Sequence, residues 1–339
     1  MRKGLYDPVY EHDACGVGFV ARLDAEARHE VVADGLSVLV NLEHRGALGG
    51  DRATGDGAGL LAQLPDAFLR RAGIECDLKL PASGEYAVGM VFLPQNESLA
   101  ARCFEALERA ARAEGADVLG WRRVPTEPDS LGELARSTCP NIRQVFLGNG
   151  SIRDADFERT LYVIRRLAEK EVASWGEAAA DFYVASLSCR TIVYKGMLTG
   201  TQLGEFFPDL VAPDFASAFA LVHQRYSTNT LPTWSLAQPL RLVAHNGEIN
   251  TLRGNASRMR AREPHLASPL FGADIEKVKP VLVETGSDSA QFDNMLEILV
   301  RAGRAIPHAM MMMVPEAWGT RYHMSADKRA FYEYHSAIL

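Results

Sequence analysis

Short apolar runs rich in β-branched and aromatic residues recur along the chain and predict strands. They cover residues 15–21, 59–64, 86–93, 144–147, 182–188, 191–194, 218–223 and 241–245. Longer segments with apolar residues at three- and four-residue spacing predict helices at residues 31–45, 97–114, 154–175, 250–263, 287–302 and 327–339. Residues 122–140, which contain prolines and serines, predict a connection. Strands and helices are mixed without a repeat or a long Pro/Gly/Ser linker, so the pattern predicts one α/β unit.

The last helical pattern, residues 327–339, ends on apolar residues. It has neither a glycine or asparagine C-cap nor a polar tail. We therefore expect the chain to stop within an element, which makes the domain incomplete at its C-terminus.

The charge balance argues against two classes of partner. The 36 Lys and Arg residues against 43 Asp and Glu residues give a net charge of −7, which leaves no basic excess for nucleic acid or anionic lipid. No apolar run approaches the roughly 18 residues of a spanning helix. Acidic residues and a proline stand where a secretory signal has its apolar core. These features predict a cytoplasmic protein that binds neither nucleic acid nor membrane.

The cysteines point to a reducing compartment. There are five of them, an odd number, and no two form a Cys-x-x-Cys pair. This spacing argues against a disulfide framework and against a zinc or cluster site in this chain. We therefore expect no metal here.

Cys15 opens an apolar, glycine-flanked strand pattern and follows a charged segment, residues 1–14. If that segment is removed, Cys15 carries a free α-amine whose reference pKa of about 7.7–8.0 is close to the 8.5 of a thiol. One residue then holds nucleophile and base, as in N-terminal nucleophiles. A lone cysteine is more often a small core residue, and the residues alone leave both interpretations open.

The densest group of polar residues runs from His223 to Thr251. Within it, Arg225 can bind a carboxylate through two hydrogen bonds, although an isolated arginine more often forms a surface ion pair. Asn246 offers a side-chain amide, and Gly247 a backbone N–H that a ligand can approach closely, as an oxyanion hole requires. The alternative for the Asn-Gly pair is a hairpin turn.

Asp288 stands in the stretch Gly286-Ser-Asp-Ser289, just before an apolar helical stripe. A carboxylate at this point can bind a substrate ammonium group. Asp288 and Gln291 also resemble a capping box, so the alternative is a helix cap. The glycine-rich residues 55–59 run into an apolar strand pattern instead of opening a helix, which argues against a nucleotide-binding motif.

Six motifs, in this order, resemble the N-terminal glutamine amidotransferase domain of glutamate synthase large subunits. That domain is a class II amidotransferase and an N-terminal-nucleophile hydrolase. The motifs are Cys15-Gly-Val-Gly-Phe19, Leu42-Glu-His-Arg-Gly-Ala47, residues 55–59, residues 223–251, Gly286-Ser-Asp-Ser289 and Phe331-Tyr-Glu-Tyr-His-Ser336. The resemblance covers nearly the whole chain. It departs from the family pattern at residues 47–51, and at Ala256-Ser-Arg258, where an Asn-Trp pair is expected.

The resemblance implies an α+β fold, the four-layer αββα sandwich of N-terminal-nucleophile hydrolases. Residues 1–14 are then a propeptide, and residues 15–339 are the amidotransferase domain. The implied catalytic residues are Cys15, Asn246 and Gly247, where Cys15 attacks the side-chain amide of L-glutamine and the other two stabilise the oxyanion. The implied substrate-binding residues are Arg225 and Thr228 for the α-carboxylate, Asp288 for the α-ammonium, and Gly286 and Trp234 around the pocket.

The resemblance also implies what happens to the product. Ammonia passes to 2-oxoglutarate at a synthase site in downstream domains of the same polypeptide, with FMN and an iron–sulfur cluster there and no cofactor in this segment. The electron donor is a small NADPH-oxidising subunit or ferredoxin. Two alternatives stay open: a stand-alone amidotransferase subunit of the same fold, and a non-catalytic module that binds glutamine.

Overall fold

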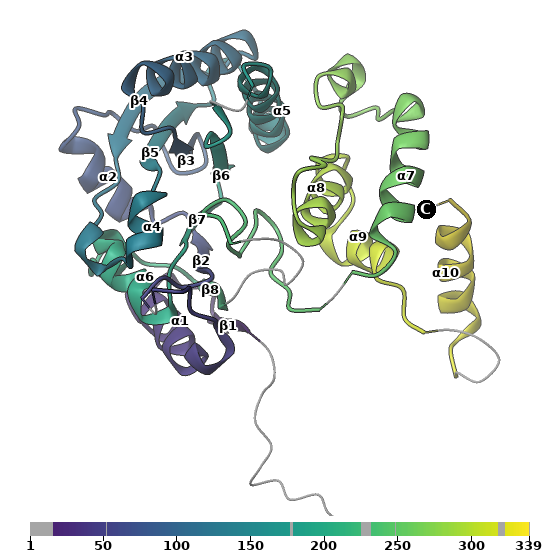
Figure 1. Cartoon of the computed structure of the whole chain (residues 1–339). Helices are drawn as coiled ribbons and strands as arrows, with labels where there is room; N and C mark the ends of the chain where they lie inside the picture. Colours follow the sequence, from purple (N-terminus) through teal and green to yellow (C-terminus); the bar gives the residue numbers. More distant parts are fainter. Residues whose placement is uncertain are drawn as a thin grey trace, which may run out of the picture.

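The computed structural model describes residues 16–51, 53–176, 179–224, 232–247, 249–317 and 323–338, with only the backbone for residues 337 and 338. Two four-stranded antiparallel sheets form its centre (Figure 1). The first sheet has the order β1-β8-β2-β7, with bounds Val17–Ala21, Phe219–Gln224, Ala58–Gln63 and Thr191–Gly196. The second has the order β4-β5-β3-β6, with bounds Asp117–Arg123, Asn141–Gly148, Tyr86–Leu93 and Tyr183–Ser188.

Strand β3 is buried on both faces, because it lies between two apolar layers. Tyr86, Val88 and Phe92 point into a core that the two sheets share. The alternate residues Ala87 and Val91 point into a second core, formed with α3 (Glu97–Ala113) and α5 (Asp154–Ala173). Since successive side chains of a strand point to opposite faces, this single strand fixes the position of one helical layer.

The first sheet is covered by α1 (His29–Asn41), with α6 (Gly200–Phe206) beside it (Figure 1). Gly35 permits the close approach of α1, because a Cβ at this position would come 2.8 Å from the Cβ of Ala220 on β8. Helices therefore lie on the outer faces of two packed antiparallel sheets. The predicted α+β sandwich is confirmed, and the α/β alternation in the chain does not build a parallel sheet.

A group of helices lies beside the sandwich: α7 (Leu252–Arg262), α8 (Asp288–Arg301), α9 (Ile306–Met313) and α10 (Ala326–Ile338) (Figure 1). Tyr162 and Val163 of α5 share an apolar cluster with Ile298 of α8, which attaches this group to the sandwich. Leu240 and Ala309 belong to another such cluster. No helix within the described residues combines the length and the apolar character needed to cross a membrane.

The structure corrects several predicted elements. Residues 241–245 are irregular and not a strand, because the backbone N–H groups of Arg241 and Leu242 donate to the Asp293 carboxylate, at 3.3 and 2.9 Å, and not to a neighbouring strand. The predicted connection at residues 122–140 contains the end of β4 and the short helix α4 (Glu133–Ser137). Helices α2 (Asp66–Ile74), α6 and α9 were not predicted.

Candidate active site

The start of β1 lies beside the end of β8. Two predicted site residues, Cys15 and Arg225, come next to these strand ends in the sequence. The backbone N–H of Gln224, the last residue of β8, donates to the Gly16 carbonyl at 2.7 Å. A Cβ at position 16 would come 2.4 Å from the Gln224 carbonyl oxygen, so only glycine fits at this contact. Cys15, Arg225 and Thr228 lie outside the described residues. Gly16, the neighbour of Cys15, and Gln224, the neighbour of Arg225, are hydrogen-bonded to each other.

Asn246 lies at the same place. Its side-chain Nδ2 is 3.6 Å from the position that a Cβ of residue 16 would occupy. Asn246 and Gly247 are both exposed, and neither has the positive φ that a type I′ hairpin turn requires. These φ values exclude a type I′ hairpin turn at this pair. The structure brings the Asn246 amide to the residue that follows Cys15.

Two hydrogen bonds hold the segment that leads to Asn246. The buried His223 ring has its Nε2 3.0 Å from the His245 carbonyl oxygen, and because a carbonyl only accepts, Nε2 carries the hydrogen. The His245 backbone N–H in turn donates to Oε1 of Gln238 at 3.1 Å. Burial lowers the pKa of His245, while the nearby charge of Asp288 opposes this change.

Two predicted substrate-binding residues, Gly286 and Asp288, lie at the N-terminus of α8. The N-cap is Ser287, whose hydroxyl accepts from the Ala290 backbone N–H at 3.2 Å, so the predicted Asp288/Gln291 cap is wrong. Asp288 is buried, and its Oδ1 accepts from the backbone N–H of Ser289 at 2.7 Å and from the Ser289 hydroxyl at 3.2 Å. Ser287, and not Asp288, therefore provides the side-chain cap of α8.

Trp234 is a core residue in the structure. Its indole is buried, with the Phe206 ring 5.5 Å away and the Phe92 ring 6.3 Å away in an edge-on arrangement. A Cβ on Gly196 would come 2.4 Å from this indole. The position is explained by packing, and the contact with glutamine stays a prediction.

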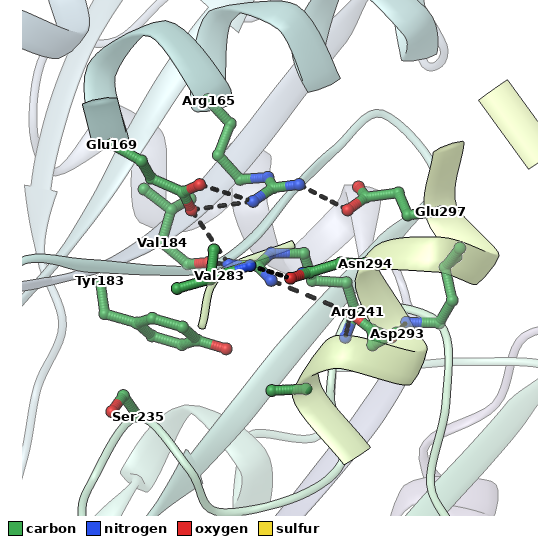
Figure 2. Close-up of polar contacts among 12 residues, drawn as sticks. Arg165, Glu169, Tyr183, Val184, Ser235, Arg241, Val283, Asp293, Asn294 and Glu297 are labelled. Carbon is green, nitrogen blue, oxygen red and sulfur yellow. Dashed lines mark hydrogen bonds and ion pairs between the residues drawn. The ribbon is translucent and has the colours of Figure 1, made fainter. Parts of the chain in front are cut away.

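Buried charges connect the sandwich to α8 (Figure 2). Arg165 contacts Glu169 at 2.8 Å and Glu297 at 2.5 Å, and Arg241 contacts Glu169 at 3.1 Å. Burial alone would raise the pKa of Glu169, but the guanidinium groups of Arg165, Arg241 and Arg166 outweigh it and lower the pKa to about 2. Burial and the charge of Glu297 raise the pKa of Asp293. We call this set, Arg165, Arg166, Glu169, Arg241, Asp293 and Glu297, the buried ion network.

A cavity of about 710 Å³ lies next to this network. It is lined by α5, by the segment before α8 that includes Gly286, and by Thr233 and Ser235. The cavity therefore reaches one predicted substrate-binding residue, Gly286, from the side of α5.

The described cysteines are poor nucleophile candidates. Burial raises the pKa of Cys103 to about 11 and the pKa of Cys139 and Cys189 to about 12, so these thiols stay protonated at neutral pH. Cys76 is exposed at the end of α2. In the part of the chain that the structure describes, no three His, Cys, Asp or Glu residues come together as a metal site.

Sequence reasoning missed two residues that shape the site, Gln238 and Lys195. Gln238 is buried and contacts both His245 and Ser289. Lys195 on β7 is fully buried and donates to the carbonyls of Ser235 and Ala237. Gln238 lies inside the polar stretch 223–251, which is the signal that the sequence offers for it. Lys195 has no such signal, because its partners are backbone carbonyls that are distant along the chain.

Comparison with known proteins adds a family match. The family model described as "Glutamine amidotransferases class-II" matches residues 15–339. Over 341 residues the chain is 50% identical to the "Glutamate synthase [NADPH] large chain" of Bacillus subtilis (strain 168), covering 99% of this chain and 22% of that protein. It is 44% identical over 338 residues to the large chain of the same name from Azospirillum brasilense, covering 98% of this chain and 22% of that one.

A third relative is named for a different electron donor. The chain is 42% identical over 341 residues to "Ferredoxin-dependent glutamate synthase 1, chloroplastic/mitochondrial" of Arabidopsis thaliana. The match covers 99% of this chain and 21% of that protein. The chain thus spans about a fifth of the length of these relatives.

Proposed function

Because the chain belongs to the class II glutamine amidotransferases, we propose that it hydrolyses L-glutamine to L-glutamate and ammonia, with Cys15 as the nucleophile. The observation that carries the proposal is the meeting of Gly16, Gln224 and Asn246 at one point. The residue before Gly16 is a cysteine and the residue after Gln224 is an arginine. A nucleophile, a carboxylate-binding group and an amide donor therefore belong to neighbouring segments.

In the proposed mechanism, removal of residues 1–14 frees the α-amine of Cys15. This amine takes the thiol proton, directly or through water, and the thiolate attacks the side-chain amide carbon of glutamine. The carbon–nitrogen bond then breaks, and ammonia leaves with the proton that the amine held. Water attacks the resulting glutamyl thioester, which releases glutamate and returns the thiol.

Asn246 and Gly247 stabilise the negative oxygen that forms in each tetrahedral intermediate. The Nδ2 group of Asn246 and the backbone N–H of Gly247 are the proposed donors, and both residues are exposed and open to a ligand. Such donors act on charge that develops in the transition state and is absent from the bound substrate. They are therefore expected to affect turnover more than glutamine binding.

The remaining predicted residues recognise the α-carbon of glutamine. Arg225 binds the α-carboxylate with Thr228 beside it, and Asp288 binds the α-ammonium group. Asp288 is supported by its burial at the start of α8, close to His245, the residue before Asn246. Gly286 keeps the approach to α8 free of a side chain, and Trp234 supports the pocket from the core.

The fate of ammonia follows from the length of the relatives. Since the chain spans about a fifth of proteins named glutamate synthase, we propose that ammonia passes to 2-oxoglutarate at a site outside this chain. FMN and an iron–sulfur cluster are proposed for that part of the longer protein, as the resemblance to glutamate synthase large subunits implies. NADPH or ferredoxin is the proposed electron source, and the free cysteines fit a cytoplasmic protein.

The nucleophile is tested with Cys15→Ala, our first prediction. The variant is expected to fold and to lose glutamine hydrolysis by at least about 10⁴-fold in kcat, because no other group replaces the thiolate. Cys76→Ala, at an exposed cysteine, is the matched control and keeps wild-type turnover. Intact-mass measurement of the active protein should find a chain that begins at Cys15.

Three results would contradict the proposed function. They are hydrolysis by Cys15→Ala at a rate near the wild type, an active protein that still carries Met1, and a wild-type protein that binds glutamine in calorimetry without hydrolysing it. The last result would identify a non-catalytic glutamine-binding module.

A further inference from the structure

We propose that Gln238 is a positioning residue that holds the Asn246 and Gly247 donors in place for the oxyanion. The inference rests on the proposed function and names a residue through which it works. Gln238 belongs to neither a helix nor a strand. It joins two parts of the candidate site that are far apart in the chain.

The side chain of Gln238 uses both ends of its amide. It is 2% exposed, and its Oε1 accepts from the His245 backbone N–H at 3.1 Å. Its Nε2 lies 3.5 Å from the hydroxyl of Ser289, which itself donates to Asp288. One neutral amide therefore contacts the residue before Asn246 and the residue after Asp288. The shorter of the two contacts is with the segment that carries the donors.

The backbone of Gln238 is fixed from the first sheet. The side-chain nitrogen of Lys195, fully buried on β7, donates to the carbonyl oxygens of Ser235 at 2.8 Å and Ala237 at 2.7 Å, and lies 3.2 Å from the Tyr183 hydroxyl. The Gln238 carbonyl packs against β2, where a Cβ on Gly59 would come 2.6 Å from it. Contacts with β7 and β2 thus hold the backbone on which the Gln238 amide is carried.

The segment after Gln238 is fixed from α8. The carboxylate of Asp293 accepts from the backbone N–H groups of Arg241 and Leu242, and Figure 2 shows Asp293 on α8 facing Arg241. Asp293 thus holds residues 241 and 242, and His223 holds the carbonyl of His245. The N–H of His245 is held by the Gln238 side-chain amide. It determines where the chain turns toward Asn246.

This arrangement gives Gln238 a chemical role beyond packing. An oxyanion donor works only when it is held at the position the negative oxygen will take. Loss of the Gln238 contact leaves the partly buried backbone N–H of His245 without this acceptor, which allows the next two residues to shift. A displacement of about 1 Å can cost about 10²-fold in rate. Toward the α-ammonium subsite Gln238 makes only the longer contact, with Ser289 and not with Asp288 itself, so the affinity for glutamine is expected to change less than turnover.

The test compares Gln238→Met with Gln238→Glu in the purified full chain. Methionine keeps the approximate length and removes both polar ends, whereas glutamate keeps an oxygen that can accept from His245. Gln144→Met is the matched control, because Gln144 is also buried and hydrogen-bonded at both ends, to Arg122 and Tyr194, within the sandwich core. Steady-state kinetics give kcat, and calorimetry in the Cys15→Ala background gives the Kd for glutamine without turnover.

We expect Gln238→Met to lower kcat by about 10²-fold while the Kd for glutamine stays within about threefold of the control. Gln238→Glu should keep at least about tenfold more turnover than Gln238→Met, since the acceptor remains. Gln144→Met should lower thermal stability and leave kcat within about threefold.

Two results overturn the proposal: a Gln238→Met protein with the turnover of the wild type, or one in which kcat falls no more than in Gln144→Met at equal loss of thermal stability. If Gln238→Met does not fold, Gln238→Leu, which also removes the acceptor, takes its place, and turnover at the level of Gln144→Met in that variant contradicts positioning. A wild-type protein without any glutamine hydrolysis contradicts the proposed function instead, which separates the two failures.

Discussion

At the scale of single residues, the site depends on backbone contacts that leave no room for a side chain. Gly16 accepts the hydrogen bond of Gln224 at a distance where any Cβ would collide with the carbonyl. The same contact brings the Asn246 amide to the start of β1. A glycine at position 16 is thus a packing requirement. It lets β1, β8 and the Asn246 segment meet.

The second prediction concerns Asn246. Asn246→Ala should lower kcat by about 10²- to 10³-fold, a barrier increase of about 2.7–4 kcal/mol, and leave KM within a few-fold. Steady-state kinetics with glutamine measure both constants. Asn149→Ala, which removes a surface amide bonded to Asp154, is the control. A large rise in KM with unchanged kcat would mean that Asn246 binds the ground state and is not an oxyanion donor.

Part of this residue-level picture was available from the sequence, and part was not. The family resemblance predicts that Asn246, Gly247 and Asp288 belong to one site, and the structure brings Asn246 beside Gly16 and Asp288 near His245. Gln238 and Lys195 were not recognised. A buried lysine that binds two carbonyls leaves no pattern in a sequence, because its partners are backbone atoms whose position only the fold determines.

At the scale of elements, α8 links stability to recognition. Our third prediction is that Ser287→Ala lowers the free energy of unfolding by about 1 kcal/mol, because the Ala290 N–H loses its acceptor. Chemical denaturation measures the change, and Ser37→Ala, at an exposed serine inside α1, is the control. If Ser287→Ala leaves the free energy of unfolding unchanged, Ser287 is not the stabilising cap, and Asp288 becomes the candidate for that role.

Strong periodicity predicted long elements well, and weak periodicity did not. The predicted helices at 97–114 and 287–302 correspond closely to α3 (Glu97–Ala113) and α8 (Asp288–Arg301). Strand β4 was missed because its partly exposed residues and the register shift between Val118 and Gly120 disturb the alternation. The prediction of a strand at residues 241–245 is wrong, since Leu240 and Val243 bury against Leu296 of α8 without sheet pairing.

At the scale of the whole molecule, the buried ion network connects α5 of the sandwich with α8 and the segment that precedes Asn246 (Figure 2). Three guanidinium groups face three carboxylates, so the network is balanced only when all six are ionised. A buried ion pair with one partner removed is far more costly than an intact one. The attachment of α8 to the sandwich is therefore expected to depend on pH.

The lowered pKa of Glu169 sets the direction in which stability changes with pH. Its folded-state pKa of about 2 lies below the value of about 4.3 for a free glutamate, so ionised Glu169 stabilises the fold above pH 4.3. That contribution, on the order of 3 kcal/mol, is lost as the pH falls from about 4.3 toward 2. Asp293 acts in the opposite direction, because its raised pKa means that its ionisation costs stability at neutral pH.

The fourth prediction concerns the charge of Glu169. Glu169→Gln should lower the free energy of unfolding by on the order of 3 kcal/mol at pH 7, and the gap to the wild type should close as the pH approaches 2. Urea denaturation at pH 7, 5 and 3 measures the gap, and Glu105→Gln, at an exposed position on α3, should show almost none at any pH. A gap that stays constant from pH 7 to pH 3 would mean that Glu169 stabilises the fold through packing. In that case its charge would not be what joins α5 to the segment that carries Asn246.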